Sequence, residues 1–578
     1  MDPTLAAELA EQDTVLRHRR LQVWIGAEPT FTDRRSQEPW WLTQAEGGDK
    51  RSRARTLLLD LAPRLGGRPR LLRLAGRHFE GEPGPRFSLG VRFRRDQPPA
   101  PGAVPEGSLD GAPLEAPPLA EGEVQLTVTP DPGVVEVNTA PAPDLATFLA
   151  DSEATYAAAA AAGLSPVRWR FNGRGSDSGG GGQLTLGGPT PEASPFFLHP
   201  TLLPRLIRYL CNHPSLSYAC AGECVGSASQ GPRPDEGVRE RFEELQVAVD
   251  RLEARGARIA PAELWESLAP LLVDASGNSH RAELNVEKLW NPFLAGRGRL
   301  GLVELRSLRM PSTAGRLAAL AALFRALVAR LVASPYLEPL ADWGASLHDQ
   351  LALPTFLDDD LRFVLDELSG HGLGLGPAAT ALLLEQPEPL AELRMDRTTL
   401  TVVPAVEFWP LLGDVASQER AGARLVDASA ERIEVRIAHD RGADPGLLGA
   451  DGWAVPLTSA DGGRRHVAGL RYRAFVPRPG LHPGLAAQDP LVLNWERDGR
   501  RVGIELHGWI PGGGAYPDLP GDASEARRRC RERVRVRDRE PGPLELRRPL
   551  AGGGVTLDLR RLTALRGSDG FTSTGGST

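Results

Sequence analysis

Apolar and polar residues alternate in four short segments of the first half of the chain, which is the pattern of a strand with one polar face. Each segment carries at least one glutamate on that face. The side chains that share the face are Trp24, Gly26 and Glu28 in "VWIGAE"; Glu136 and Asn138 in "VVEVN"; Arg281, Glu283, Asn285 and Glu287 in "RAELNVEK"; and Leu302, Glu304 and Arg306 in "GLVELR". The sequence therefore predicts strands that present carboxylates from one side.

Other segments follow the helical period. The run "LAALAALFRALVARLVAS" (residues 317–334) is apolar but contains Arg325 and Arg330, which predicts a buried amphipathic helix rather than a membrane span. Two further helices are predicted to end at Gly163 and Gly256, because glycine readily takes the left-handed conformation at a helix end. The apolar stripe of the second helix consists of Phe242, Leu245, Val249 and Leu252.

From about Leu400 the pattern changes to short alternating strands separated by turn residues, as in "ERIEVRIA" and "LVLNWERDGRRVGIELHG". This predicts an all-β sandwich in the C-terminal part. The charges of Arg432, Glu434 and Arg436 balance one another, so we expect this polar face to lie in solvent.

Composition excludes several classes of protein. The 578 residues have a formal net charge of −7 with mixed signs, which argues against a nucleic-acid partner. The acidic start "MDPTLAAELAEQD" lacks the apolar core of a secretory signal, and four cysteines give no disulfide framework, so we expect a soluble cytoplasmic protein. Cys220 and Cys224 lack a second pair of zinc ligands and a histidine to activate a thiol, and we interpret them as buried structural cysteines.

A glycine-rich stretch, "RWRFNGRGSDSGGGGQLTLGG", runs from residue 168 to 188 with four consecutive glycines at 179–182. A phosphate-binding P-loop would continue into a helix and carry a lysine, whereas "QLTLGG" alternates like a strand. We interpret the stretch as a glycine-rich crossing between two strands, whose use depends on what the neighbouring strands carry.

The carboxylates of the predicted strands outnumber the cations. If the polar faces converge, this excess is unfavourable unless protons or cations bind. Oxygen ligands without a cysteine or histidine cluster suit Mg²⁺ or Mn²⁺, which in turn hold nucleotide phosphates. The alternative for any one strand is that its polar face lies in water. The groups counted are Glu28, Glu136, Glu283, Glu287 and Glu304 against Arg281 and Arg306.

Several motifs occur in order along the chain, and together they resemble a bacterial amidoligase family. They are "GAEPTF" (26–31), "TPDPGVVEVNTAPA" (129–142), "HPSLSY" (213–218), "SQGPRPDE" (229–236), "SGNSHRAELNVEKL" (276–289) and "GRLGLVELRSLRMP" (298–311). Further matches such as "WGASLHD" and "GWIPGGGAYPDLP" extend the resemblance over nearly the whole chain. It implies an α+β fold with a glutamine-synthetase-like curved antiparallel sheet and helices on its outer face, followed by the C-terminal sandwich.

We expect the following domain boundaries. Residues 1–96 form the N-terminal part of the amidoligase-like domain, and 97–123 form a linker or insertion rich in Pro and Gly. Residues 124–395 form the core of that domain, 396–550 form the sandwich, and 551–578 form a mostly disordered tail.

The resemblance also implies a reaction, in which ATP phosphorylates a carboxylate and an amine then displaces the phosphate to leave an amide. Mg²⁺ (or Mn²⁺) and arginine would stabilise the charge on the transferred phosphoryl group. The substrates would be a peptide or amino-acid carboxylate and an amine. The implied metal ligands are Glu28, Glu136, Glu304 and Glu283; the catalytic or orienting residues are Arg306, Glu287, Arg281 and Asn138; the nucleotide contacts are Gly179, Gly180, Gln183, Arg77 and Arg86.

Two departures from the family pattern leave alternatives open. In relatives the glycine loop reads like "GRHTGTGGGNH", whereas Gly175, Gly182 and Gln183 occupy the matching positions here. Losing such histidines weakens metal affinity or activity by ~10–100-fold. Relatives usually carry a transglutaminase-like domain before this module, so a separate transglutaminase-like or ATP-grasp protein is an expected partner. The alternatives are a noncatalytic protein that binds a peptide or partner enzyme, and a thiol acyltransferase.

Overall fold

The computed structural model describes residues 2–35, 48–66, 68–73, 87–94, 123–226, 229–234, 236, 243–274, 277–294, 298–410, 426–439, 444–475, 486–539, 544–549 and 554–564. These residues form helices and mainly antiparallel sheets, an α+β architecture. Nearly all of the expected linker and the last fourteen residues of the expected tail lie outside the described residues.

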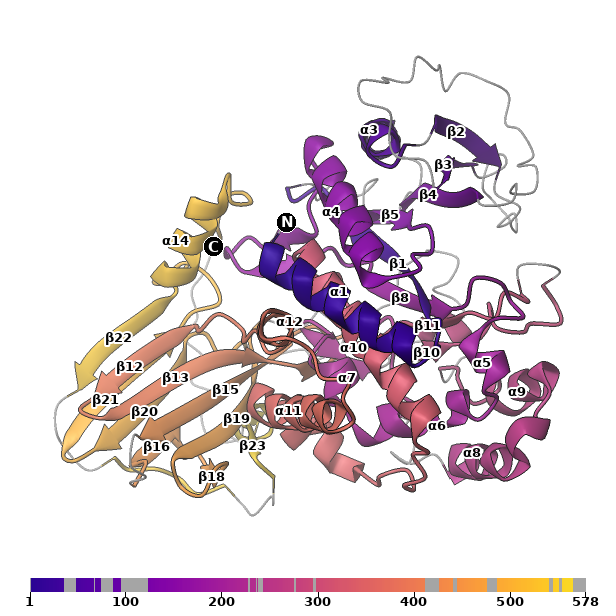
Figure 1. Ribbon diagram of the computed structural model, residues 1–578. Helices are drawn as coiled ribbons and strands as arrows, with labels where there is room; N and C mark the ends of the chain where they lie inside the picture. Colours follow the sequence, from indigo (N-terminus) through magenta and orange to yellow (C-terminus); the bar gives the residue numbers. More distant parts are fainter. Residues whose placement is uncertain are drawn as a thin grey trace.

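An eight-stranded antiparallel sheet runs through the first half of the molecule (Figure 1). Its strands lie in the order β10, β11, β8, β1, β5, β4, β3, β2, so segments far apart in sequence become neighbours. The bounds are β1 Trp24–Phe31, β2 Arg68–Arg73, β3 Phe87–Arg94, β4 Glu123–Asp131, β5 Val134–Asn138, β8 Gly182–Gly187, β10 Leu284–Asn285 and β11 Val303–Leu305. The four alternating segments contribute β1, β5, β10 and β11 to this one sheet, but β10 has only two residues, and Arg281 lies in a 3₁₀ turn before it.

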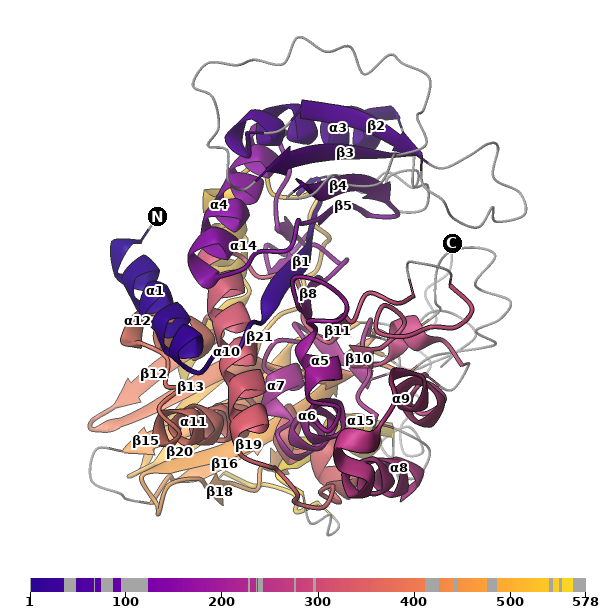
Figure 2. The ribbon, with the colours of Figure 1, turned by 45° about the vertical axis from the view of Figure 1, so that its right-hand side comes forward.

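Helices cover the apolar face of this sheet. The central strands turn Ile25, Ala27, Leu184, Leu186, Val303 and Leu305 to that face, and each is at most 2% exposed. They form one core with the helices α1 (Pro3–His18), α4 (Leu145–Ala161), α6 (Leu202–Asn212) and α10 (Ala314–Ala333). A second core lies under α3 (Gly48–Arg64), which packs on β3 and β4 (Figure 2). The apolar side chains therefore face the helices, and the polar side chains of the same strands lie on the opposite face.

The central helix α10 contains the two arginines that interrupted its apolar run. Arg325 pairs with Asp13 of α1, and Arg330 pairs with Glu367 of α11 (Pro354–Gly370). Both arginines are more than 90% buried, so these partners compensate charges that water cannot reach. The predicted buried helix is confirmed. Among the described residues, none of the helices is sufficiently long and apolar to traverse a bilayer.

Most of the remaining helices lie around this core, whereas α14 (Ala523–Glu532) and α15 (Leu559–Ala564) pack on the C-terminal sheets. In α8 (Glu243–Arg255) the predicted residues Leu245, Val249 and Leu252 are buried. Gly256, the first residue after this helix, has φ +57°. The others are α5 Pro195–Leu198, α7 Ser215–Tyr218, α9 Pro261–Leu268, α12 Pro377–Leu383, α14 Ala523–Glu532 and α15 Leu559–Ala564, with 3₁₀ turns at Gly256–Arg258, Ser279–Arg281, Gly344–His348 and Gln350–Ala352.

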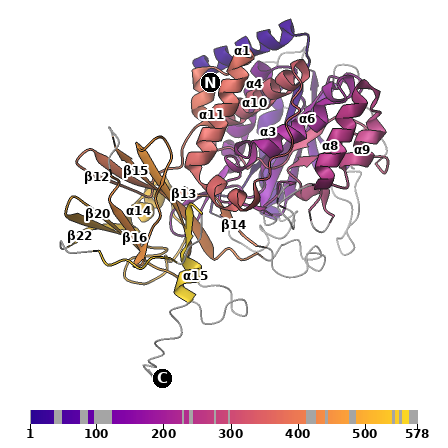
Figure 3. The same cartoon turned by 90° about the horizontal axis from the view of Figure 1, so that it is seen from below.

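Two larger sheets make up most of the C-terminal part (Figure 3). Buried side chains of both sheets, among them the fully buried Trp495, form one hydrophobic cluster. The first sheet contains β12 Ala391–Met395, β13 Thr398–Ala405, β15 Ala430–His439, β19 Arg465–Arg473, β18 Thr458–Ser459 and β23 Thr556–Asp558. The second contains β17 Trp453–Ala454, β16 Leu447–Ala450, β20 Leu491–Arg497, β21 Arg500–Leu506 and β22 Val534–Arg539.

The prediction that "ERIEVR" turns its charges to solvent is wrong. Glu434 is 0% exposed and Arg432 only 3% exposed. Thr355, in the first turn of α11, donates its backbone N–H to Glu434 Oε2 at 2.9 Å and its hydroxyl to Oε1 at 2.8 Å. A carboxylate is favourable at a helix N-terminus, where N–H groups lack partners. Alternation identified the polar face, but only the tertiary structure supplies the helix that covers it.

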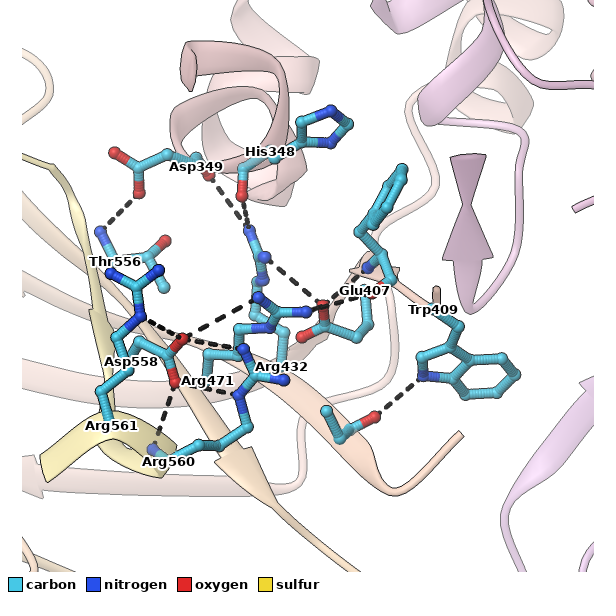
Figure 4. A network of polar contacts seen from close by, with 12 residues as sticks. His348, Asp349, Glu407, Trp409, Arg432, Arg471, Thr556, Asp558, Arg560 and Arg561 are labelled. Carbon is cyan, nitrogen blue, oxygen red and sulfur yellow. Dashed lines mark hydrogen bonds and ion pairs between the residues drawn. The ribbon is translucent and has the colours of Figure 1, made fainter. Parts of the chain in front are cut away.

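Glu407 lies at the junction between the C-terminal sheets and the first half. It belongs to β14 (Glu407–Phe408), which pairs in parallel with β9 (Cys224–Val225). Arg471 Nη2 lies 2.7 Å and Arg432 Nη2 lies 3.5 Å from Glu407 Oε1 (Figure 4). Two guanidinium groups thus surround one buried carboxylate.

The segment 554–564 is fixed at the same junction. Asp349 accepts the backbone N–H groups of Val555 at 2.9 Å and Thr556 at 2.7 Å. Asp558 then binds the Arg560 guanidinium, with Nη2 to Oδ2 at 2.8 Å (Figure 4). The part of the expected tail that the structure describes therefore forms a strand and a short helix packed on β19.

Candidate functional site

The second face of the central strands carries buried polar side chains, and the strand register brings them together. Glu28 of β1 lies opposite Gln183 of β8, while Thr185 of β8 lies opposite both Gly26 and Glu304. Residues directly opposite one another in antiparallel strands project to the same face. Glu28 and Glu304 therefore lie on one face with a single strand between theirs.

The third expected metal ligand shares this face. Glu136 of β5 lies opposite Thr30, which is two residues from Glu28 along β1. Asn138 Nδ2 donates to Glu136 Oε1 at 2.8 Å. On the far side of β11, Asn285 lies opposite Glu304. The strand register places Glu28, Glu136 and Glu304 on one face of the sheet, and their role as metal ligands stays a prediction.

A lysine connects two of these carboxylates. Lys288 Nζ lies 2.5 Å from Glu28 Oε1 and 3.4 Å from Glu304 Oε2. Its side chain is 36% exposed, against 11% for Glu28 and 2% for Glu304. Lys288 follows β10 in the turn toward β11, so it reaches over the sheet from one edge. An ammonium ion thus lies between carboxylates from two non-adjacent strands.

The electrostatics of the three carboxylates differ. Burial, followed by the charge of Glu304, raises the pKa of Glu28, although Lys288 acts in the opposite direction. Burial and nearby carboxylates, Glu28 first, raise the pKa of Glu136 to about 8. Burial alone would raise the pKa of Glu304, but Arg306 and Lys288 hold it below its ordinary value. The site is therefore short of positive charge on the Glu28 and Glu136 side.

Arg306 lies beside Glu304 at the edge of this cluster. Its Nη1 pairs with Glu304 Oε1, and its Nε donates to the His280 carbonyl at 3.1 Å. Glu287 accepts a hydrogen bond from the Ser279 hydroxyl, and its Oε2 lies 3.4 Å from His280 Nε2. The hydrogen bond from His280 lowers the pKa of Glu287 to about 2, against the effect of burial. Glu287 is thus a stable anion and a weak base.

Two other expected residues have separate partners. Glu283 is 1% exposed, and its Oε1 lies 3.8 Å from Nη1 of the buried Arg233. Arg281 Nη1 donates to the Ser229 carbonyl at 2.8 Å. Among the residues that the structure describes, no three His, Cys, Asp or Glu side chains gather closely enough to hold a metal ion. The contacts that the structure shows at this site are those of Lys288 with Glu28 and Glu304.

The glycine run packs against the edge of the polar face. Gly179 has φ +93° and Gly181 has φ +102°, which few other residues adopt. Thr30 Oγ1 donates to the Gly181 carbonyl at 2.5 Å. A Cβ atom at Gly180 would lie 2.8 Å from the Thr30 side chain, and one at Gly182 would lie 2.5 Å from Pro311 Cδ. Close approach to β1 and to the segment after β11 therefore requires glycine.

The backbone N–H groups of this run serve the protein itself. Gly179 N–H donates to Asp177 Oδ1 at 2.6 Å, Gly180 N–H to Ser178 Oγ at 3.3 Å, and Gly182 N–H to the Leu308 carbonyl at 3.0 Å. Gln183 is 3% exposed. Arg77 and Arg86 lie outside the described residues. The nucleotide contacts predicted here stay a prediction, and the N–H groups of Gly179, Gly180 and Gly182 already bind protein oxygens.

A separate cavity of about 700 Å³ lies between the first half and the C-terminal sheets. It is bordered by the hairpin β6 (Val167–Trp169) and β7 (Gly175–Asp177), by α11, by the end of β13 and by α14. Glu28, Glu136 and Glu304 are not part of its lining, which includes Trp169, Tyr218, Arg316, Leu357, Trp409 and Arg531. The cavity is therefore distinct from the carboxylate cluster.

The cysteines lack the properties of a nucleophile. Cys224 is buried and Cys220 is half-buried, and both are free thiols. Burial raises the pKa of both thiols, although Arg309 near Cys224 acts in the opposite direction. A raised pKa disfavours the thiolate that nucleophilic attack needs.

Lys288, which contacts both Glu28 and Glu304, is a residue of this site that alternation missed. Glu283, Asn285 and Glu287 alternate, but the strand ends at Asn285 and the following turn brings the adjacent Lys288 over the polar face. Composition carries the signal that could have found it: of 67 Lys and Arg residues, only Lys50 and Lys288 are lysines. A lysine at this position is therefore unusual for the chain.

One comparison with known proteins gives a match. The model of the family described as "Putative amidoligase enzyme (DUF2126)" matches residues 5–101 and 113–560. No curated protein and no solved structure matches the chain.

Proposed function

The chain belongs to this amidoligase family, and from that premise we propose that it is an ATP- and Mg²⁺-dependent carboxylate–amine ligase. The observation that carries the proposal is the set of carboxylates on the polar sheet face, where Glu28 and Glu304 contact the Lys288 ammonium and the neighbouring Glu136 has a raised pKa. We also retain the glutamine-synthetase-like arrangement of the sheet, the C-terminal β-sandwich and a cytoplasmic location as proposals.

The residues present fit a divalent cation by their chemistry. Oxygens of Glu28 and Glu304 already bind one cation, the Lys288 ammonium, and Mg²⁺ prefers carboxylate oxygens. Glu28 and Glu304 would hold the ion, and Glu136 lies on the same face of the sheet; Glu283, paired with Arg233, would support the adjoining strand. Mg²⁺, when bound, would neutralise charge on the phosphate oxygens.

The proposed reaction has two steps. An oxygen of the substrate carboxylate attacks the γ-phosphorus of ATP, the bond to the β–γ bridging oxygen breaks, and ADP leaves an acyl phosphate behind. The amine nitrogen then attacks the acyl carbon and loses a proton, the bond from carbon to the phosphate oxygen breaks, and inorganic phosphate leaves. The product is an amide or isopeptide.

Arg306 is the residue that we propose to contact the transferred phosphoryl group. Glu304 and the His280 carbonyl hold its guanidinium group, which can bind two phosphate oxygens at once. Glu287, an anion with pKa of about 2, is suited to orient an ammonium substrate rather than to remove its proton. We propose that Arg281 supports the neighbouring loop through Ser229.

We propose that the cavity of about 700 Å³ receives the peptide or amino-acid substrate. The segment after β11 leads from Arg306 toward it, because Ser312 and Arg316 line the cavity. Six extended residues span at most about 20 Å, so the cavity lies within reach of the carboxylates. A separate transglutaminase-like or ATP-grasp protein remains a proposed partner.

Phosphate release tests the proposed reaction. We expect release from ATP in the presence of Mg²⁺ and a mixture of amino acids and peptides, and its loss in Glu304→Gln. The matched control is Glu392→Gln on β12, an exposed glutamate far along the chain from the site. Absence of both release and nucleotide binding in the wild-type protein would reject the ligase.

The noncatalytic alternative has one observation in its favour. The N–H groups of Gly179, Gly180 and Gly182 bind protein oxygens, so they are not available to a phosphate in this conformation. A noncatalytic protein would bind a peptide without releasing phosphate. Wild-type turnover that disappears in Glu304→Gln would exclude it.

A further inference from the structure

We propose that the cavity of about 700 Å³ binds a short peptide whose free C-terminal carboxylate is held by Arg527 and Arg531 of α14. We call these two arginines the carboxylate anchor. The inference rests on the proposed function, because it names the class of substrate for the cavity that we assign to the substrate. The anchored carboxylate is a recognition group, so the group that reacts lies elsewhere along the peptide.

One face of α14 borders the cavity, where the C-terminal sheets meet the first half of the molecule (Figure 1). Residues three and four apart share a helix face, and the lining contains Ala523, Ala526, Arg527, Cys530 and Arg531. Arginines on other faces fix the helix to the turn between β6 and β7. Arg529 Nη1 donates to the Phe171 carbonyl at 2.7 Å. Just after the helix, Arg533 Nε donates to the Asn172 carbonyl at 3.1 Å.

The carboxylate anchor lacks the partners that the other arginines of the cavity have. The described lining contains six arginines. The four outside α14 each pair with a glutamate; they are Arg170, Arg174, Arg316 and Arg432. The side chains of Arg527 and Arg531 are exposed and make no ion pair or hydrogen bond with another described residue. Two guanidinium groups therefore border the cavity without an anion from the described structure.

The spacing of the two arginines suits a carboxylate. They are four residues apart, which is about one helical turn, or roughly 6 Å along the helix axis. A guanidinium group can donate two parallel hydrogen bonds to a carboxylate. Two long side chains from successive turns can thus approach the same carboxylate. Every peptide with an unmodified C-terminus carries such a group.

The remaining walls suit the side chains of a peptide. The apolar lining residues include Trp169, Leu357, Leu361, Leu383, Leu384, Leu390 and Trp409. Trp409 Nε1 donates to the Ala430 carbonyl at 2.9 Å, so its polar atom is satisfied and its ring is left for apolar contact. Pockets of about 300–1,000 Å³ enclose most of a drug-sized ligand, so this cavity has room for several residues rather than one.

Charge on another wall favours a peptide over a nucleotide. Glu388 lies between α12 and β12, lines the cavity and is exposed. It makes no ion pair with a described residue, so it would attract the ammonium group of a peptide and repel a triphosphate. The negative charges of a triphosphate also outnumber the two arginines of the anchor. The cavity therefore offers an unpaired cation pair and an unpaired anion, which a zwitterionic peptide complements.

Retention of peptides from a synthetic mixture tests the anchor. Pentapeptides are supplied in two forms, with a free C-terminal carboxylate and with a C-terminal amide, and ultrafiltration followed by mass spectrometry measures which form the protein retains. We expect the wild-type protein to retain the free acids roughly tenfold more strongly than the amides, because the amide lacks the charge-assisted hydrogen bonds. Equal retention of both forms, or retention of neither, would overturn the proposal.

Variants of α14 locate the anchor. Arg527→Gln combined with Arg531→Gln should retain acids and amides equally. The matched control is Arg528→Gln, on the same helix but outside the cavity lining, where Arg528 pairs with Glu532. It should keep the preference of the wild-type protein. All three arginines are exposed, so we expect the variants to fold, and thermal unfolding checks this. A preference for free acids that survives in the double variant contradicts the assignment.

Alkylation of Cys530 shows where the peptide binds. This half-buried free thiol lines the cavity between Arg527 and Arg531 of the same helix face. We expect the retained free-acid peptides to slow its reaction with iodoacetamide in the wild-type protein and not in the double variant, as measured by mass spectrometry. An unchanged rate in the wild-type protein would overturn the proposal. Protection by ATP that competes with the peptides would show that the cavity takes a nucleotide, which also overturns it.

The outcomes separate the inference from the function on which it rests. Retention of free acids without phosphate release from ATP supports the anchor and rejects the ligase. Phosphate release with an unchanged KM for the peptide in the double variant rejects the anchor and leaves the ligase standing. A KM for the peptide that rises roughly tenfold in the double variant, with kcat unchanged, supports both, because the anchor binds the peptide without touching the reacting atoms.

Discussion

The polar face of the first sheet and the junction around Glu407 both bury carboxylates and cations. The two regions differ in how the charges of these groups are compensated. At the junction, Glu407 lies between Arg432 and Arg471, and Asp558 binds Arg560. On the sheet face, Glu28 and Glu304 share Lys288, and Glu304 also pairs with Arg306. Each of these junction carboxylates thus has a guanidinium partner, whereas the partner of Glu136 on the sheet face is the neutral amide of Asn138.

The pKa values follow this difference. Burial alone would raise the pKa of Asp558, but hydrogen bonds and charge from Arg560 hold it below its ordinary value. At Glu136, burial and neighbouring carboxylates raise the pKa to about 8. We call a buried cluster matched when each carboxylate has a cationic partner, and unmatched when one does not. A matched cluster stabilises the fold, while an unmatched one costs stability until a ligand supplies the missing charge.

Removing the central anion of the junction should have the largest effect. Glu407→Ala leaves Arg432 and Arg471 buried together without their shared partner, so we expect the free energy of unfolding to fall by about 3–5 kcal/mol. Urea denaturation measures this loss. Glu392→Gln, an exposed change on β12, should stay within about 0.5 kcal/mol. A loss below about 1 kcal/mol for Glu407→Ala would contradict a structural role for the matched cluster.

The comparison also explains what the sequence could predict. Alternation found the polar faces that carry Glu28, Glu136 and Glu304, because side-chain direction in a strand depends only on local period. It could not supply the order of the strands, which brings β1 between β8 and β5. The motifs along the chain indicated the family, which the family match confirms.

The errors and omissions share one physical cause. Glu434 was expected in solvent, but it binds Thr355 in the first turn of α11, 79 positions away in the sequence. Lys288 was overlooked because the turn after Asn285 breaks the alternation. Glu283 has a partner, Arg233, from another motif. Partners brought together by tertiary structure leave no trace in a local pattern.

Supplying the missing charge should stabilise the unmatched cluster. We expect Mg²⁺ with ATP, at a hundredfold excess over Kd, to raise the free energy of unfolding of the wild-type protein by ~2.7 kcal/mol. Glu304→Gln should lose most of this gain, and Glu407→Gln, if it folds, should keep it. Thermal unfolding with and without ligand measures both. An equal gain in Glu304→Gln would place the nucleotide elsewhere.

Protonation should also relieve the unmatched cluster, and the sign follows from Glu136. Its pKa is about 8 in the folded protein and 4.5 ordinarily, so the folded state binds the proton more tightly. The resulting stability is complete below about pH 4.5 and is lost as pH rises through 8. Glu136→Gln should therefore be more stable than wild type at pH 8.5, by roughly 1–3 kcal/mol.

Urea denaturation between pH 5 and pH 8.5 measures this effect. The difference between Glu136→Gln and wild type should grow with pH, and the slope should be flatter in the variant. Asp558→Asn serves as the contrast from the matched junction, where the folded protein favours the ionised form. A difference between Glu136→Gln and wild type that is constant over this range would show that Glu136 is ionised throughout.

The smallest effect belongs to a pair that is matched but exposed. Arg316 Nη1 lies 2.8 Å from Glu385 Oε2 at the rim of the cavity, and the two side chains are 23% and 57% exposed. Water solvates both charges whether or not they pair, so Glu385→Gln should lower the free energy of unfolding by about 0.2–1 kcal/mol, less at high salt. Urea denaturation at low and high salt measures it. A loss as large as that of Glu407→Ala would mean that an ion pair contributes equally to stability whether it is buried or exposed.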